Sequence, residues 1–111
     1  MTVVIALFFL GMGLVGLAAP ERIAATFGTP VLSGDGRNEV RAVYGGFGVA
    51  IGALLLAAPA RPGVPLCVAT ALGGMAGGRL VSALLEPPRR FYPCWFYFAV
   101  EVLMAVALVV R

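Results

Sequence analysis

The stretch from Val64 to Glu86 is almost entirely apolar or small, yet it carries one charge well inside it, Arg79. A helix of this length rises about 30 Å, which is enough to cross the hydrocarbon core of a bilayer. An arginine within such a helix needs a polar partner, because an isolated charge in lipid is costly. The stretch therefore predicts a membrane-spanning helix that packs against a second helix carrying a complementary group.

The expected partner is Glu101, in the last apolar stretch of the chain. The segment from Pro87 to Tyr92 reads as a short turn near Arg89 and Arg90. At 1.5 Å per helical residue, Arg79 and Glu101 each lie about 15 Å or somewhat less from that turn. An antiparallel hairpin would bring the two charges to one depth, so we expect them to be in contact.

Composition places the whole chain among membrane proteins. Its 111 residues are 61% hydrophobic and 12% charged, and the mean hydropathy is +1.02, outside the range of ordinary soluble domains. Proline- and glycine-rich breaks separate four apolar runs. The sequence predicts an all-α membrane protein: a four-helix bundle forming a single integral membrane domain over residues 1–111. The predicted spans are residues 2–19, 38–58, 64–86 and 92–110, with a short interfacial helix at Pro20–Gly28 after the first.

Several kinds of chemistry have little support. There is no histidine, which removes the commonest general base and most zinc sites. Cys67 and Cys94 begin successive antiparallel spans, so their thiols should lie on opposite membrane faces, too far apart for a disulfide. We predict no metal site and no cofactor. No catalytic residues can be named, and an enzyme is the less favoured interpretation. The arginines are scattered with no dense basic run, which disfavours nucleic acid as a partner.

Polar residues also enter the second span. Asn38, Arg41, Gly45, Gly48 and Gly52 share one helical face, with Tyr44 beside it. An arginine on a glycine-rich face indicates that this face points toward protein. We expect Arg41 to approach Arg79 and Glu101, with Glu39 near the membrane surface. The candidate ligand-binding or polar cluster is Arg41, Arg79, Glu101, Tyr44, Glu39, Asn38 and Tyr97.

This cluster has two interpretations, and the sequence leaves both open. In the first it is structural and fixes the register of the helices. In the second it is a small-ligand or ion site, because charges inside a membrane are functional candidates. Two arginines beside one deep carboxylate would suit an anionic head group or a quinone-like oxygen. Glu101 near Tyr97 would alternatively suit proton transfer.

Glycines at small-xxx-small spacing predict close helix packing. The residues concerned are Gly48, Gly52, Gly73, Gly74, Gly77 and Gly78. Because a four-helix bundle cannot bury every one of these faces internally, we expect a homo-oligomer or a larger membrane complex. Aromatic residues from Phe91 to Tyr97 read as a belt at the membrane interface, with the lipid bilayer as the partner.

The distribution of arginines predicts the orientation. The first and third loops hold Arg22, Arg37, Arg89 and Arg90, with Arg41 just inside the membrane. The opposite side holds Arg61, Arg111 and the N-terminal amine. Positive charge is retained on the cytoplasmic side, so we expect the first and third loops in the cytoplasm and both termini outside.

Two segments carry a family resemblance: NEVRAVYGGFGVAIG at Asn38–Gly52 and GGRLVSALLE at Gly77–Glu86. With Pro20-Glu21 and Glu101, they resemble a bacterial family of small four-helix membrane proteins of unknown function. The resemblance covers nearly the whole chain. It implies the four-helix architecture and a location in the bacterial inner membrane, and it implies no activity.

Two functional hypotheses follow. In the first, this multi-pass protein binds or moves a small ligand, anionic or lipid- or quinone-like, at an intramembrane Arg/Glu cluster. In the second, it is a non-catalytic structural or accessory subunit that docks on a larger membrane complex.

Overall fold

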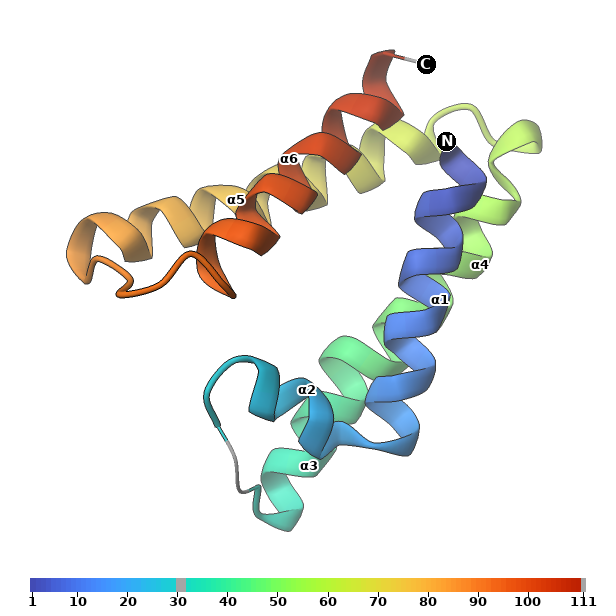
Figure 1. Ribbon diagram of the computed structural model, residues 1–111. Coiled ribbons are helices and arrows are strands. Elements are labelled where there is room, and N and C mark those ends of the chain that lie inside the picture. Colours follow the sequence, from blue (N-terminus) through green and yellow to red (C-terminus); the bar gives the residue numbers. More distant parts are fainter. Residues whose placement is uncertain (30–31, 111) are drawn as a thin grey trace. The chain divides into compact units, whose positions relative to one another are not determined.

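A computed structural model describes residues 1–29 and 32–110 (Figure 1). The predicted all-α class is confirmed for these residues. The elements in chain order are α1 (Thr2–Ala18), α2 (Pro20–Thr26), α3 (Gly34–Val40), the π-helix η1 (Arg41–Gly46), α4 (Phe47–Leu56), the 3-10 turn η2 (Ala58–Ala60), α5 (Val64–Leu85) and α6 (Cys94–Val110). The chain divides after Ala60 into two compact units. We call Thr2–Ala60 the N-terminal hairpin and Arg61–Arg111 the C-terminal hairpin.

The predicted short helix after the first apolar run is present as α2. It turns by 112° from the direction of α1, and Pro20, which needs no hydrogen-bond acceptor for its nitrogen, occupies its first turn. The helix ends at Thr26, and Gly28, just beyond the C-cap, adopts φ 87°. The backbone N–H groups of Gly28 and Thr29 donate to the carbonyls of Ala25 and Ala24, the pattern of a Schellman cap.

The second long helix is continuous from Gly34 to Leu56. It begins earlier than the expected residue 38, because the Ser33 hydroxyl accepts a hydrogen bond from the backbone N–H of Gly36 and caps the first turn. Residues 34–36 therefore belong to this helix, and Pro30 lies outside the described residues. Within the helix, Arg41–Gly46 is π-helical, which the sequence did not predict.

In the N-terminal hairpin, glycines bring α1 and α4 into backbone contact (Figure 1). A Cβ atom added to Gly13 would lie 2.7 Å from the Gly45 carbonyl oxygen. One added to Gly48 would lie 2.9 Å from the Phe9 carbonyl oxygen, and one added to Gly52 would lie 2.8 Å from that of Ala6. No side chain fits at such distances, so glycine is required by the closeness of the two helices.

The C-terminal hairpin pairs α5 with α6. The buried α5 positions Ala69, Leu72, Ala76 and Ala83 form one seam, and with Arg79 included the spacings along it alternate between three and four. On α6, Glu101 and Leu108 are buried seven residues apart. Prolines mark the loop between the helices, since Pro87 and Pro88 follow α5 and Pro93 precedes α6. The seam therefore consists of alanine and leucine side chains around one pair of charges.

Two helices are long and apolar enough to cross a membrane: Gly34–Leu56 and Val64–Leu85. The pair α1 and α2 meets the criterion only when both are counted as one bent span, and α6 is a shorter apolar helix. Two or three such helices indicate a multi-pass membrane protein. Four spans are therefore not confirmed: the predicted span 92–110 corresponds to α6, a helix of 17 residues that begins at Cys94 and falls below the length criterion.

Candidate functional site

The structure brings Arg79 and Glu101 together in the C-terminal hairpin. The Arg79 Nε donates to Glu101 Oε1 at 2.9 Å, and the Arg79 Nη2 donates to Oε2 at 3.0 Å. This is the bidentate geometry in which a planar guanidinium matches a carboxylate. Glu101 is only 4% exposed, whereas the Arg79 side chain is 22% exposed. The pair therefore places a buried anion behind a partly accessible cation.

The ring of Tyr97 lies beside the arginine of this pair, and Tyr92 follows it toward the loop. The guanidinium carbon of Arg79 lies 5.7 Å from the ring centre of Tyr97, within the range of a cation–π interaction. The Tyr97 hydroxyl is 3.5 Å from that of Tyr92, in the loop before α6, and Tyr92 is 47% exposed. A row of polar groups thus runs from the exposed end of the hairpin toward Glu101.

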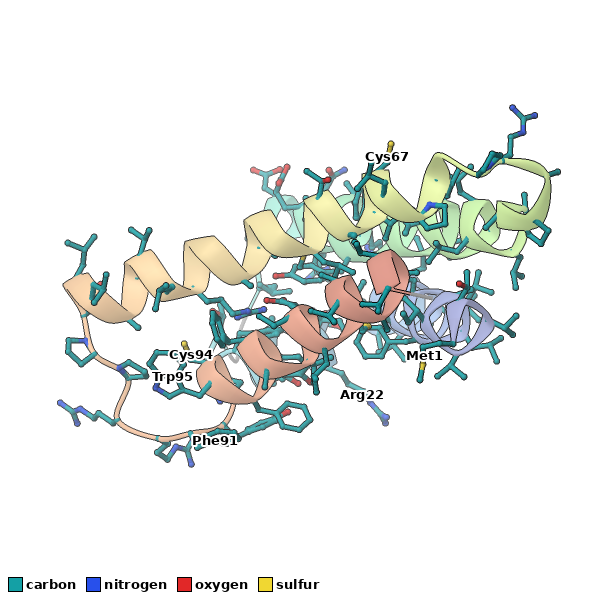
Figure 2. The ribbon with its side chains drawn as sticks, turned by 90° about the horizontal axis from the view of Figure 1, so that it is seen from above. Met1, Arg22, Cys67, Phe91, Cys94 and Trp95 are labelled. Atoms are coloured by element: carbon teal, nitrogen blue, oxygen red, sulfur yellow. The ribbon has the colours of Figure 1, made fainter. Side chains whose placement is uncertain are left out.

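The loop end of the hairpin is rich in aromatic rings. Phe91 and Trp95 lie there beside Cys94 (Figure 2). The Trp95 and Phe98 rings meet edge to face at 5.6 Å, and Phe91 is 63% exposed. Cys67 lies toward the other end of the hairpin, and both thiols are free. The two cysteines are therefore separated as their positions in the sequence predict.

The α5 glycines contrast with those of the N-terminal hairpin. A Cβ added to Gly73, Gly74, Gly77 or Gly78 would meet no described atom within 4 Å. All four glycines are exposed. Gly74 and Gly78 lie on the side of α5 opposite the seam that faces α6, and Gly73 and Gly77 lie between that side and the seam, as the helical spacing requires. The expected packing partner of this face is thus not found within the C-terminal hairpin.

Arg41 has its contact within the N-terminal hairpin. Its Nε donates to the backbone carbonyl oxygen of Leu17 at 3.1 Å, one of the last carbonyls of α1, which helical hydrogen bonds leave unpaired. The structure does not test its expected approach to Arg79 and Glu101, which stays a prediction. Tyr44 stacks on Phe27 of the α2 end, with ring centres 6.2 Å apart. The bend after α1 is therefore fixed from two sides.

Asn38 and Glu39 are exposed on α3. Among the residues that the structure describes, neither side chain has a hydrogen bond or ion pair, and no group of three acidic, cysteine or histidine side chains could hold a metal ion. A neighbouring ion pair, which the sequence did not single out, joins Arg37 to Glu21 at 3.9 Å. It links α3 to α2 across the bend.

Comparison with protein families adds one finding. The family model described as "Domain of unknown function (DUF4345)" matches residues 1–111. The chain belongs to the DUF4345 family. No curated protein and no solved structure matches this DUF4345 chain. The expected membership of a family of unknown function is thus confirmed over the whole chain, and the function has to be argued from the geometry.

Sequence reasoning missed the π-helix of this DUF4345 protein. The only signal is the string Arg41–Gly46, in which two glycines end a polar turn. π-Helical turns inside α-helices are frequent at functional sites.

Proposed function

We propose that this protein spans the membrane several times and binds a small ligand beside the Arg79–Glu101 pair. The observation that supports it best is a carboxylate, 4% exposed, paired within two apolar helices with an arginine whose side chain is 22% exposed. Charged groups inside membranes are costly, and they mark ligand or ion pathways in many membrane proteins.

The chemistry of the pair restricts the ligand. Glu101 holds the guanidinium of Arg79 in a fixed plane, and the Tyr97 ring lies beside it. A fixed guanidinium that is partly exposed recognises oxygen acceptors, as on an anionic head group or a quinone-like ring. The row from Tyr92 to Tyr97 gives such a ligand polar contacts on its way from the loop end of the hairpin.

In this proposal all four long helices cross the bilayer. Helices α1 and α6 have 17 residues each, which corresponds to about 25 Å and to the short end of the range for a span. The loops at Arg22 and Arg89 would face the cytoplasm of a bacterial inner membrane. An impermeant thiol reagent applied to intact cells should label a single cysteine introduced beside Arg61 but not one beside Arg89; the reverse pattern would invert the orientation.

A charge exchange tests the ligand site. In the double variant Arg79→Glu with Glu101→Arg the ion pair is kept, so we expect folding to be largely restored relative to either single variant. Ligand retention should be lost, because the cation then sits on α6. The measurement is mass spectrometry of small molecules released from the purified protein, with wild type as the positive control. A double variant that folds and retains the same molecules would show that the pair has only a structural role.

The second candidate function is that of an accessory subunit or homo-oligomer, and the open glycines of α5 favour it. Helices with exposed small residues at this spacing pack closely against other membrane helices. Cross-linking in membranes should yield dimers or defined complexes with wild type and fewer with Gly77→Leu. Gly48→Leu is not a useful comparison, since Gly48 is packed against α1. An unchanged monomer in both mild detergent and membranes would count against this candidate.

A further inference from the structure

Arg41 occupies a second polar position, in the N-terminal hairpin, that the proposed ligand site does not use. Its side chain is exposed, although it lies two turns inside a helix long and apolar enough to span a membrane. Among the described residues its only side-chain hydrogen bond runs from Nε to the Leu17 carbonyl oxygen. No carboxylate of the described chain lies within ion-pair distance of it.

The depth of Arg41 follows from its contact. Leu17 lies in the last turn of α1, and after Ala18 the chain turns by 112° into α2. A span that ends and is followed by a crosswise helix marks the border between hydrocarbon and head groups. This inference rests on the proposed function, in which α1 crosses the membrane; Arg41 then lies at the level of the phosphates, where arginine side chains direct their charge toward the membrane surface.

The contact also orients the guanidinium. With Nε donating to Leu17, the edge formed by Nη1 and Nη2 makes no hydrogen bond to a described residue. That edge has the two parallel N–H donors that match two oxygens of a phosphate. Stacking of Tyr44 on Phe27 holds the adjacent turn of η1 against α2, so the position is kept without a ligand.

We propose that Arg41 is the centre of a binding site for an anionic phospholipid, whose head-group phosphate the Nη1–Nη2 edge holds at the bend between α1 and α2. Asn38 lies three residues earlier on the same helix, where neighbouring side chains meet, and it adds an amide donor. An anionic lipid fits better than a zwitterionic one, because no carboxylate of the described chain neutralises Arg41 at this site.

Arginine-specific labelling of the unmodified protein tests the site. The full chain is placed in nanodiscs of phosphatidylcholine, alone or mixed with phosphatidylglycerol, and treated with phenylglyoxal. Mass spectrometry then gives the labelling rate at each arginine. Arg22 is the internal control, since it is exposed on α2 in the same hairpin and has no side-chain hydrogen bond or ion pair to the described residues.

We expect phosphatidylglycerol to slow labelling of Arg41 about tenfold, as loss of access to a charge-assisted hydrogen-bonded group implies, and to slow that of Arg22 much less. Glycerol phosphate added in water should protect neither residue, because it lacks the acyl chains that bring the phosphate to this depth. Equal protection of Arg41 and Arg22 would reduce the effect to general screening of charge and overturn the proposal. No protection of Arg41 would also overturn it, and protection by glycerol phosphate would indicate a soluble anion instead of a lipid.

Variants give an independent readout. Native mass spectrometry should show retained phosphatidylglycerol on wild type and on Arg22→Gln, and about tenfold less on Arg41→Gln. Arg41→Lys keeps the charge but loses the two parallel donors, so we expect an intermediate loss; retention equal to wild type would refute the role of the Nη1–Nη2 edge. Should Arg41→Gln fail to fold, the lysine variant and the labelling of wild type still decide the question.

Discussion

In the N-terminal hairpin the backbones of α1 and α4 are in contact, whereas in the C-terminal hairpin α5 and α6 meet through alanine and leucine side chains and one ion pair. In the N-terminal hairpin the glycines lie in the helix–helix contact. Gly13 and Gly48 lie against each other, and a Cβ on Gly48 would fall 2.9 Å from the Gly13 Cα. The second hairpin leaves its glycines open and buries Glu101. Two apolar helices are thus held together by close backbone packing in the N-terminal hairpin and by a specific ion pair in the C-terminal hairpin.

This difference has a physical consequence. Without a hydrophobic driving force between helices in lipid, association depends on van der Waals packing and on polar contacts. Glycine packing is insensitive to charge but intolerant of any added atom. An ion pair tolerates changes of nearby volume but fails when one partner is removed, since the other charge is left unpaired. The two hairpins should therefore respond to opposite kinds of substitution.

The largest effect should come from Glu101→Leu. It leaves Arg79 within the apolar hairpin with no carboxylate from α6, and breaking a buried pair costs about 3 kcal/mol or more. Glu101→Gln should cost less, because the amide oxygen still accepts a hydrogen bond from Arg79. Thermal unfolding in lipid or mild detergent measures both. A leucine variant as stable as the glutamine variant would show that the pair does not hold α5 to α6.

Alanine at glycine positions should separate the two hairpins directly. Gly13→Ala places a methyl group against backbone and should destabilise by about 1–3 kcal/mol, as overpacking does. Gly77→Ala has open space and should be neutral or stabilise by up to about 1 kcal/mol, from the better helix propensity of alanine. The two variants are compared in the same unfolding assay at low protein concentration. Equal losses would contradict the assignment of packed and open glycines.

A smaller effect is expected from Tyr97→Leu. The substitution removes the cation–π contact with Arg79 but keeps a large apolar side chain, so stability should fall by about 0.5–1 kcal/mol. Retention of the ligand should fall more than stability does, if the Tyr97 ring forms one wall of the ligand site. Tyr97→Phe keeps the ring and serves as the matched control. Unchanged ligand retention in the leucine variant would remove Tyr97 from the proposed site.

Counting residues from a turn was enough to place Arg79 opposite Glu101, because helical rise is constant and two prolines mark the end of α5. Proline and glycine breaks likewise located the helices to within a few residues. The role of each glycine could not be predicted. Gly48/Gly52 and Gly73/Gly77 have the same spacing, yet only the first pair meets another helix among the described residues. Spacing shows that a helix can be approached, and only the fold shows which neighbour approaches it.

The hydrogen bond of Arg41 shows a second reason why some contacts could not be predicted from the sequence. Its guanidinium donates to a backbone carbonyl of α1, and every residue has such a group, so no sequence pattern identifies this partner. The π-helix that carries Arg41 has no strong sequence signal either. Charge complementarity predicts a contact between two side chains, such as Arg79 and Glu101. It does not predict a contact between a side chain and the backbone, such as that of Arg41 with Leu17.

A double-mutant cycle on Arg79 and Glu101 tests the central claim most directly. The single variant Arg79→Leu removes the arginine partner of Glu101, and the single variant Glu101→Leu removes the carboxylate partner of Arg79, whereas the double variant replaces the pair by apolar side chains. The account predicts that the double variant is more stable than the Glu101→Leu single and recovers most of the loss, with a coupling of about 1.5–3 kcal/mol in lipid. If the losses of unfolding free energy in the two single variants simply add in the double variant, with a coupling near zero, then the two charges do not depend on each other. That result would contradict the proposed pairing of α5 and α6 through Arg79 and Glu101.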